Sequence, residues 1–367
     1  MKIKIFVDAH VFDDTYQGTT TYIKGLYNAL VKNDQFEITL AANDIEKLKV
    51  HFTDRRFKFI SLPSNSKIRR LAIDIPRLIK KGNFDYAHFQ YITPLIKECK
   101  YINTIHDILF LEFPKLFPLK YRIKNKLTFK FSALQSDIIC TVSAFSKDAL
   151  VKYMNIDKSK IIITPNAIDE EKVDFVDVKR KYDISQFILF VSRFEPRKNH
   201  YLLLKVFVET KLYLSYKLVL IGKRRDVETA DFNNYFDGLP ETIKKSIIFF
   251  EGISVEELSS FYKEADLFIY PSAAEGFGIP PLEAAVAGCK VLCSNKTAMS
   301  DFDFFGKYLF DPENIEEFKS KINQILNDEN YPFAEISTAA HNKYNWQVIS
   351  NKFGGEIINN YLVNSKY

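Results

Sequence analysis

The sequence of 367 residues lacks any long hydrophobic run, although 47% of its residues are hydrophobic. No stretch reaches the roughly 20 apolar residues that a helix needs to cross a bilayer. The first residues lead directly into the strand-like segment 2–9, without the basic and apolar pattern of a signal peptide. We therefore expect a cytoplasmic globular protein, long enough for two domains with separate cores.

Cysteine is scarce, and the four in the chain are Cys99, Cys140, Cys289 and Cys293. They lie mostly in apolar, strand-like surroundings, as reduced core cysteines do. Cys289 and Cys293 have a CxxxC spacing, but no other cysteine pair or histidine cluster lies nearby to complete a zinc shell. The cysteines therefore predict neither disulfides nor a metal cofactor.

The two glycine-rich motifs that most often bind nucleotides are also missing. Without G-x-G-x-x-G, a dinucleotide-binding dehydrogenase loses its main support, and without GxxxxGK[ST] a P-loop kinase is unlikely. One glycine, Gly18, stands between the first strand and the first expected helix, where backbone amides often meet phosphate.

Charge is modest overall but uneven along the chain. The net charge is +5, and residues 1–170 hold 27 Lys and Arg against 18 Asp and Glu, which leaves the remainder at −4. The basic residues of the first half are dispersed among apolar helix residues, and no standard nucleic-acid-binding motif is present. We expect no nucleic-acid partner.

Short strand-like segments alternate with helical stretches twice along the chain, the pattern of doubly wound α/β domains. A polar stretch, 173–185, separates the two series, and the second begins near Gln186. Tandem domains of this kind face a central cleft between the carboxyl ends of their sheets, where ligands bind. The expected strands are 2–9, 36–42, 57–62, 84–90, 101–107, 137–143, 160–166, 187–193, 216–222, 246–252, 266–272 and 290–295.

The densest candidate site is the segment 270–284, YPSAAEGFGIPPLEA, which follows a strand and leads into a helix. Its glycines, Gly276 and Gly278, let a ligand approach the backbone, and the free amides of the helix start can bind phosphate or sugar oxygens. Glu283 falls in the first helical turn, where a carboxylate can bind the two hydroxyls of a ribose or simply stabilise the helix.

A second candidate site, the segment 190–200 (FVSRFEPRKNH), also runs from strand to loop to helix. Arg193 and Lys198 together can neutralise a pyrophosphate leaving group, or else belong to a loop of solvated charges. His106, beside Asp107, ends another strand, and such a histidine is functional or structural with equal probability from its position alone.

Taken together, these segments resemble the family-4 retaining glycosyltransferases of the GT-B fold. The pair of glutamates eight positions apart, Glu275 and Glu283, with GFG between them, is the most specific part of the resemblance. It spans nearly the whole chain through an ordered set: Gly18, His106-Asp107, 143–147, 165–169, Ser192-Arg193, Lys198-Asn199, Gly252, 275–283 and Trp346. Only one glycine stands in the first loop, where many members have two, and Glu195 makes the second loop unexpectedly acidic.

The resemblance implies a role for each matching residue. Glu283 binds the donor ribose, and Glu275 lies beside the transferred sugar with the amides of Gly276, Phe277 and Gly278. Arg193 and Lys198 hold the diphosphate, with help from the backbone near Gly18, while His106 lies at the reacting centre. The expected catalytic residues are thus His106 and Glu275, and Gly252 belongs to the donor site.

The resemblance also implies retention of anomeric configuration without a metal ion. Residues 1–170 form an acceptor domain, residues 171–346 form a nucleotide-sugar domain, and a helix over 347–367 crosses back to the first. The expected donor is a GDP-mannose-like or UDP-sugar, and the acceptor a saccharide or lipid-diphosphate-linked saccharide in bacterial polysaccharide or lipopolysaccharide synthesis. The alternative is a non-catalytic protein of the same fold that binds nucleotide sugars or glycans.

Two further segments bear on partners. The basic and apolar stretch 117–130 suits an anionic membrane surface, or is an ordinary helix with a solvated lysine face. Asp301-Phe302-Asp303 resembles a short acidic metal-binding motif of other glycosyltransferases, but it has no supporting acidic neighbours and favours a structural role.

Overall fold

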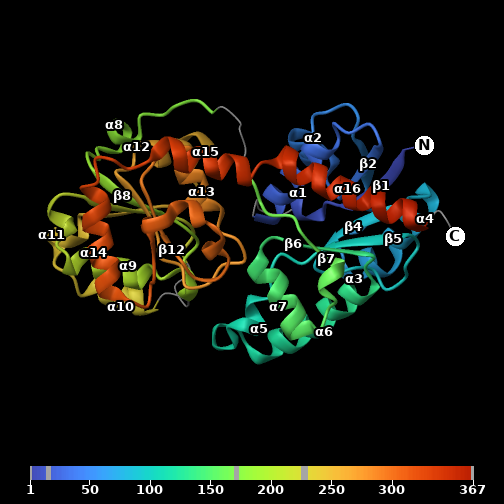
Figure 1. The fold of residues 1–367 in the computed structure, drawn as a ribbon, viewed down its shortest axis with the longest axis horizontal. Coiled ribbons are helices and arrows are strands. Elements are labelled where there is room, and N and C mark those ends of the chain that lie inside the picture. The colour runs from blue at the N-terminus through green and yellow to red at the C-terminus, as the bar shows by residue number, and fades with distance from the viewer. Residues whose placement is uncertain (1, 14–17, 169–172, 225–229, 365–367) are drawn as a thin grey trace. The chain divides into compact units, whose positions relative to one another are not determined.

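The computed structural model describes residues 2–13, 18–168, 173–224 and 230–364. The chain forms two compact units, unit 1 with residues 1–169 and 344–367 and unit 2 with residues 170–343 (Figure 1). The expected boundary between residues 170 and 171 lies outside the described residues. Residues 344–346, expected in the second domain, group with unit 1.

Unit 1 is built on a parallel sheet of seven strands among the described residues, in the order β3-β2-β1-β4-β5-β6-β7. Every residue of β4 and β6 is buried, as in a sheet covered on both faces by helices. The strands are β1 (Ile3–Asp8), β2 (Phe36–Ala42), β3 (Lys58–Ser61), β4 (Tyr86–Gln90), β5 (Lys100–Thr104), β6 (Ile138–Thr141) and β7 (Ile161–Ile163).

Unit 2 repeats this plan with a six-stranded sheet in its described part, in the order β10-β9-β8-β11-β12-β13. The two parallel α/β units confirm the expected fold class, while the cleft between them stays a prediction. The strands are β8 (Phe187–Val191), β9 (Lys217–Ile221), β10 (Ile247–Phe250), β11 (Leu267–Tyr270), β12 (Val291–Ser294) and β13 (Leu309–Phe310). The two-residue β13 has no strand-like sequence signal.

Helices follow most strands. Those of unit 1 are α1 (Gly18–Leu30), α2 (Ile45–His51), α3 (Lys67–Arg69), α4 (Ile75–Gly82), α5 (Leu109–Glu112), α6 (Leu119–Gln135), α7 (Ala144–Met154) and α16 (Trp346–Asn364). Those of unit 2 are α8 (Val178–Tyr182), α9 (His200–Glu209), α10 (Ala230–Asp237), α11 (Glu241–Lys244), α12 (Val255–Glu264), α13 (Ile279–Val286), α14 (Ile315–Leu326) and α15 (Phe333–Lys343). Ser254 and Glu257 form a capping box at the start of α12.

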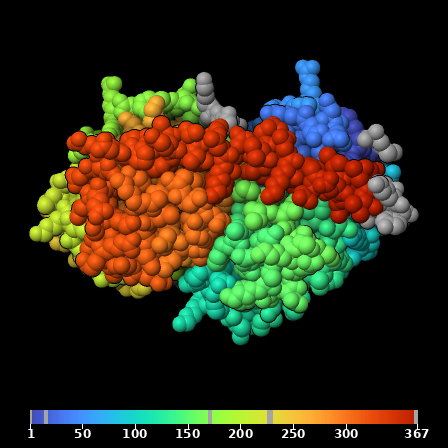
Figure 2. Space-filling view, viewed as in Figure 1, coloured from blue at the N-terminus to red at the C-terminus, as the bar shows by residue number. Residues whose placement is uncertain are grey.

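The C-terminal helix α16 packs against α1, near the other end of the sequence (Figure 1). In Figure 2 it runs in red along the blue and green residues of unit 1. Trp346, at its start, lies so close to Gly25 that a Cβ atom at Gly25 would come within 1.9 Å of the indole ring. Gly25 is therefore required for this close approach of the two helices.

Candidate functional site

The two loops that the sequence singled out in unit 2 follow neighbouring strands of its sheet. β8 leads into the loop with Arg193 and Lys198, and β11 leads into the loop with Glu275. The two strands pair directly in the sheet. The order of the strands reverses direction between β8 and β11, so this is the point of the sheet where ligands of doubly wound folds bind. The topology therefore brings these two loops together.

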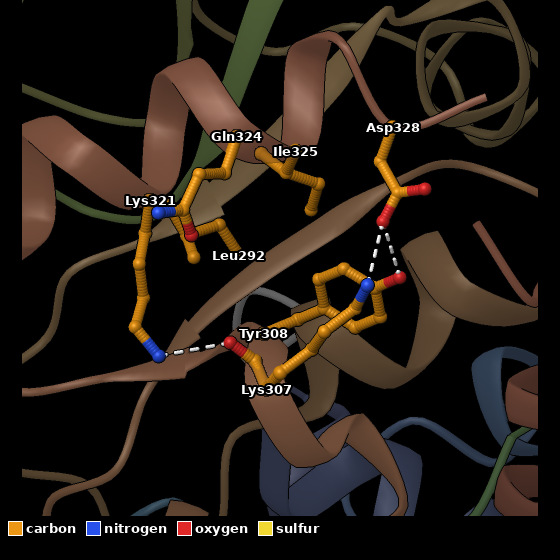
Figure 3. Close-up of a pocket in the computed structure, with 7 residues that line it drawn as sticks. All are labelled: Leu292, Lys307, Tyr308, Lys321, Gln324, Ile325 and Asp328. Atoms are coloured by element: carbon orange, nitrogen blue, oxygen red, sulfur yellow. Dashed lines mark hydrogen bonds and ion pairs between the residues drawn. The ribbon is translucent and has the colours of Figure 1, made fainter. Parts of the chain in front are cut away.

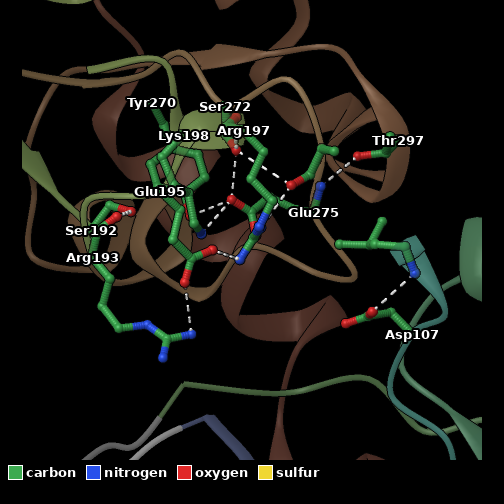
Figure 4. Close-up of polar contacts among 12 residues, drawn as sticks. Asp107, Ser192, Arg193, Glu195, Arg197, Lys198, Tyr270, Ser272, Glu275 and Thr297 are labelled. Carbon is green, nitrogen blue, oxygen red and sulfur yellow. Dashed lines mark hydrogen bonds and ion pairs between the residues drawn. The ribbon is translucent and has the colours of Figure 1, made fainter. Parts of the chain in front are cut away.

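Glu275 is the centre of the polar contacts in these loops (Figure 4). Its Oε1 accepts hydrogen bonds from Lys198 Nζ at 2.5 Å, Ser272 Oγ at 2.6 Å and Tyr270 Oη at 3.0 Å. Arg197 Nη1 donates to its Oε2 at 2.8 Å. Burial would raise the pKa of Glu275, but the charges of Lys198 and Arg197 and the hydrogen bonds lower it to about 2. Glu275 is therefore a buried, ionised carboxylate.

Lys198 lies at the end of a short 3₁₀ helix, Pro196–Lys198, and is itself buried. Its ammonium contacts both Glu275 and the hydroxyl of Tyr270, the latter at 3.1 Å. Burial lowers the pKa of Lys198, with Glu275 acting in the opposite direction. The next residue, Asn199, has a φ of 59° and donates from its side-chain amide to Pro271 O at 2.9 Å, which ties this loop to the end of β11.

Arg193 does not contact Glu275. Its side chain is 62% exposed and forms an ion pair with Glu195 at 3.1 Å. Glu195 in turn pairs through its other oxygen with Arg197 at 2.7 Å. The acidic residue that made this loop unusual in the sequence is therefore a link between two arginines.

The glycine loop after Glu275 leads into α13 through Gly278, whose φ of 104° favours glycine. Gly276 and Phe277 are buried beside it, and Phe277 packs edge-on against Phe302. Glu283 lies in α13, half-buried, and Tyr262 of α12 donates to its Oε2 at 2.8 Å. The described contacts hold Glu275 and Glu283 through different partners, consistent with two separate tasks.

The remaining predicted donor residues lie at element ends. Gly252 follows β10 with a φ of 67° and is exposed. Gly18, in unit 1, is the first residue of α1, and among the described residues no atom beyond its own helix lies within 4 Å of where a Cβ would be. The preceding residues 14–17 of that loop lie outside the described residues.

His106 lies just beyond β5 of unit 1 and is buried. Its Nε2 donates to the amide oxygen of Gln90 at 2.7 Å, and Gln90 Nε2 contacts His88 Nε2 at 3.3 Å. Burial lowers the pKa of His106 to about 4 and that of His88 to about 3. Both rings are therefore neutral near pH 7, and the convergence of His106 with the residues of unit 2 stays a prediction.

Two other features of unit 2 are a small cavity and the short acidic motif. The cavity in Figure 3, of about 40 Å³, has room for little more than water molecules and is far too small for a nucleotide sugar. Asp328 at its rim is bonded to Lys307 and Tyr308, each at 2.9 Å. Asp303, of the short acidic motif, pairs with Lys343 at 2.9 Å, and no described group of three or more His, Cys, Asp or Glu is placed to hold a metal.

A residue of this charged network that the sequence did not single out is Arg197. It lies between the two charges that the pattern emphasised, yet it is largely buried and contacts both Glu195 and Glu275. Burial would lower the pKa of Arg197, but Glu275 and Glu195 raise it above the ordinary value. The available sequence signal was Glu195, because an acidic side chain in this loop needs a basic partner and Arg197 lies two positions away.

Two family models match the chain and together cover most of it. "Glycosyltransferase Family 4" matches residues 16–172, and "Glycosyl transferases group 1" matches residues 172–342. Both names agree with the resemblance seen in the sequence. The two models meet at residue 172, next to the division between the two units.

Among curated relatives, the chain is 29% identical to the O-antigen chain mannosyltransferase B of Escherichia coli over 65% of this chain and 64% of that protein. It is also 29% identical to the O-antigen chain mannosyltransferase RfbU of Salmonella typhimurium, over 68% and 67% of the two lengths. The structure of HepE from Anabaena in complex with UDP-glucose superposes with a TM-score of 0.73 at 14% identity, covering 97% of this chain and all of that one.

Proposed function

The chain belongs to the family-4, group 1 glycosyltransferases, and we propose that it transfers a hexose from a nucleotide sugar to a saccharide acceptor in the synthesis of bacterial surface polysaccharide. The observation that carries this proposal is the set of contacts at Glu275. A buried, ionised carboxylate at the switch point of the sheet, between two basic side chains, suits the binding of a sugar joined to a diphosphate.

Each side chain of this site has a task in the proposal. Glu275 accepts hydrogen bonds from hydroxyls of the transferred sugar, beside the amides of Gly276, Phe277 and Gly278. Glu283, oriented by Tyr262, accepts hydrogen bonds from the ribose. Ribose recognition by a carboxylate is common in nucleotide sites because one carboxylate can accept from two neighbouring hydroxyls.

The leaving diphosphate is neutralised by Arg193 and Lys198, with Gly252 and the backbone near Gly18 completing the donor site. Because two cations and the amides of a helix start can stabilise this charge, we propose that transfer needs no metal ion. Activity that is unchanged in the presence of EDTA supports this, whereas loss on chelation and recovery with Mg²⁺ or Mn²⁺ contradicts it. Retention of configuration, which follows from the family resemblance, is tested by NMR of the anomeric proton of the first-formed product.

The donor is a hexose nucleotide, with GDP-mannose favoured and UDP-sugars as the second candidate. Two relatives that share 29% identity are named mannosyltransferases, and HepE is described with UDP-glucose. A thermal-shift panel of GDP-mannose, UDP-glucose and other nucleotide sugars distinguishes these donors, because at equal concentration the donor with the lower Kd stabilises the folded protein more.

The acceptor is a saccharide, free or linked to a lipid diphosphate, and unit 1 has a polar cavity of a suitable size. This cavity of about 590 Å³ lies within the size range of ligand sites. Its lining residues at the carboxyl ends of β1, β2 and β3 are His10, Asp13, Asn43, Asp44, Lys47, Leu62, Pro63, Asn65 and Arg70. Sugar hydroxyl groups suit such a mixture of hydrogen-bond donors and acceptors.

His106 is proposed to act at the reacting centre as a neutral imidazole.

We also propose that the protein works at an anionic membrane surface on the inner side of the cell. No helix among the described residues is long and apolar enough to span a bilayer. Helix α6 instead exposes Leu119, Ile123, Leu127, Phe131 and Leu134 among five basic side chains and no acidic one. Apolar and basic residues together favour adsorption to anionic lipid.

Liposome co-sedimentation tests this association. We expect binding to vesicles with anionic lipid at low salt, and weaker binding after Leu127→Glu with Leu134→Glu, both exposed positions. Equal pelleting with neutral and anionic vesicles, or no pelleting at low salt, contradicts it.

The glycosyltransferase activity itself is tested by Glu275→Ala and Glu283→Ala in a folded protein. We expect both variants to lose transfer, and Glu283→Ala to weaken nucleotide binding more. A non-catalytic binding protein of the same fold is distinguished by turnover, because it shows thermal stabilisation by a donor without any product. Full activity in either variant removes that glutamate from the site.

A further inference from the structure

Five charged side chains of unit 2 form a continuous chain of ion pairs with alternating sign (Figure 4). The order is Arg193, Glu195, Arg197, Glu275 and Lys198. Each carboxylate uses one oxygen toward Arg197 and the other toward one end of the chain. Glu195 contacts Arg193 through Oε1 and Arg197 through Oε2, and Glu275 contacts Lys198 through Oε1 and Arg197 through Oε2.

The two ends of this chain are the cations assigned above to the donor diphosphate. Arg193 and Lys198 must both turn from a carboxylate to the phosphates when the donor binds. A carboxylate that loses its cation in a buried site is destabilised, because desolvation is no longer compensated. A positive charge must therefore remain beside Glu275 to keep it ionised in the donor complex.

On the basis of the proposed function, we infer that Arg197 is a positioning residue that stays with both carboxylates while Arg193 and Lys198 transfer to the diphosphate. Arg197 thus keeps Glu275 charged and in place for the sugar hydroxyls. It does not touch the donor in this scheme, and no covalent step is involved.

The backbone contacts of Arg197 fit a residue that does not move. Its Nη1 also donates to Ala274 O at 2.7 Å, and its own carbonyl oxygen accepts from Ala273 N at 2.8 Å. Arg197 is therefore bonded to the segment just before Glu275 through both its side chain and its main chain. Only 15% of its side chain is exposed, whereas Arg193 is 62% exposed and able to reorient.

The other groups around Glu275 allow Lys198 to turn away from its carboxylate. Tyr270 and Ser272 continue to donate to Oε1, and the Glu275 amide donates to Thr297 Oγ1 at 2.9 Å. The remaining titratable neighbour is the buried thiol of Cys293, whose pKa burial raises. Of the groups facing Glu275, Arg197 is then the cation that balances its charge.

The test compares wild type with Arg197→Gln in calorimetric titrations with GDP and UDP, in two buffers of different ionisation enthalpy at pH 6 and pH 8. Without Arg197, Glu275 must take up a proton when Lys198 turns to the diphosphate. We expect Arg197→Gln to take up about one more proton than wild type on binding, and to bind about a hundredfold more weakly at pH 8 than at pH 6 relative to wild type, because one proton corresponds to about tenfold per pH unit. Protonation by the phosphate itself cancels in this comparison.

Control variants separate this role from a general effect on structure. Arg180→Gln, at an exposed position of the same unit, is expected to match wild type. Arg197→Lys restores charge but reaches one carboxylate at a time, so its proton uptake is expected to lie between wild type and Arg197→Gln. Binding by Arg197→Gln with wild-type affinity and no additional proton overturns the inference.

Should Arg197→Gln fail to fold, Glu195→Gln provides the second measurement. It releases Arg193 from its ion pair, so the affinity for GDP or UDP is expected to rise about threefold, the size of a modest surface pair. Weaker binding by Glu195→Gln overturns the exchange of partners. A wild-type protein that binds neither nucleotide contradicts the proposed function itself, which is a different outcome from normal binding without proton uptake in the variants.

Discussion

The polar network around Glu275 in unit 2 and the polar network around His88 in unit 1 differ in charge. In unit 2, five ionised side chains alternate in sign around Glu275. In unit 1, Tyr27, His88, Gln90, Thr104 and His106 form a buried network in which both histidines are neutral near pH 7. A charged network can exchange partners with a charged ligand, whereas a neutral one holds its geometry without responding to ions.

The largest expected effect comes from removing the central charge of unit 2. Glu275→Gln leaves the buried Lys198 without a carboxylate and Arg197 with Glu195 alone, so the free energy of unfolding of unit 2 should fall by about 3–5 kcal/mol. Transfer activity should be lost as well. Urea denaturation followed by circular dichroism measures the first effect. As a control, Glu316→Gln removes an 83% exposed partner of Lys319 and should change stability by less than about 1 kcal/mol.

Acidification should affect the neutral network of unit 1 before it affects Glu275. His88 and His106 have pKa values lowered from 6.5 to about 3 and about 4, so their contribution to stability is complete above pH 6.5 and is lost as the pH falls. Between pH 7.5 and pH 5 we expect a loss of about 2 kcal/mol for each histidine. The contribution of Glu275 is lost only below pH 4.5, toward its pKa of about 2.

Fluorescence of Trp346 can follow this loss in unit 1, because it is the one tryptophan of the chain and is buried there. A probe restricted to unit 1 is needed, since burial also lowers the pKa of His200 in unit 2 to about 3. His106→Gln should reduce the pH dependence of the free energy of unfolding of unit 1 by about half. A stability that is flat from pH 7.5 to pH 5 contradicts the neutral network.

The glycines of the two candidate phosphate loops should respond differently to a methyl group. Gly278 has a φ of 104° and an added Cβ would lie 3.3 Å from Met299 Cγ, so Gly278→Ala should cost about 1–2 kcal/mol. Gly18→Ala meets no atom of the described residues beyond its own helix within 4 Å and should change stability by less than about 0.5 kcal/mol. Denaturation midpoints compare the two variants, and equal losses would contradict the difference.

A small effect is also expected at the acidic motif. Asp303 is 79% exposed and paired with Lys343, so Asp303→Asn should change stability by less than about 1 kcal/mol. Transfer should be the same as in wild type, with and without EDTA. A metal-dependent loss of activity in this variant would restore the motif as a metal site.

The sequence allowed the strands of both units to be predicted because fully buried parallel strands appear as short apolar runs bounded by turn residues. It was less informative where local pattern and tertiary packing disagree. The apolar periodicity of residues 67–81 predicts one amphipathic helix with Ile68 on its apolar face, but the segment forms as α3, a π-helical segment (Arg70–Asp74) and α4. Ile68, expected on its apolar face, is 81% exposed.

The candidate site was predictable residue by residue but not as a network. Glu275, Glu283 and Lys198 were recognisable from spacing and position. The ion pairs of Arg197 with Glu195 and Glu275 were not, because these partners lie 2 and 78 positions away in the sequence. The pairing of β8 with β11 is what brings Glu275 to Arg197. The pairing of His106 with Gln90 likewise depends on neighbouring strands, β4 and β5, and has no signal in local sequence.

The return of α16 to unit 1 has a consequence for the order in which the protein folds during synthesis. Unit 2 is continuous in sequence, over residues 170–343, whereas unit 1 is completed only by residues 344–367. Domains usually fold in the order of their synthesis, N-terminal first. In this chain the surface of α1 that contacts Trp346 stays uncovered until the whole of unit 2 has been synthesised.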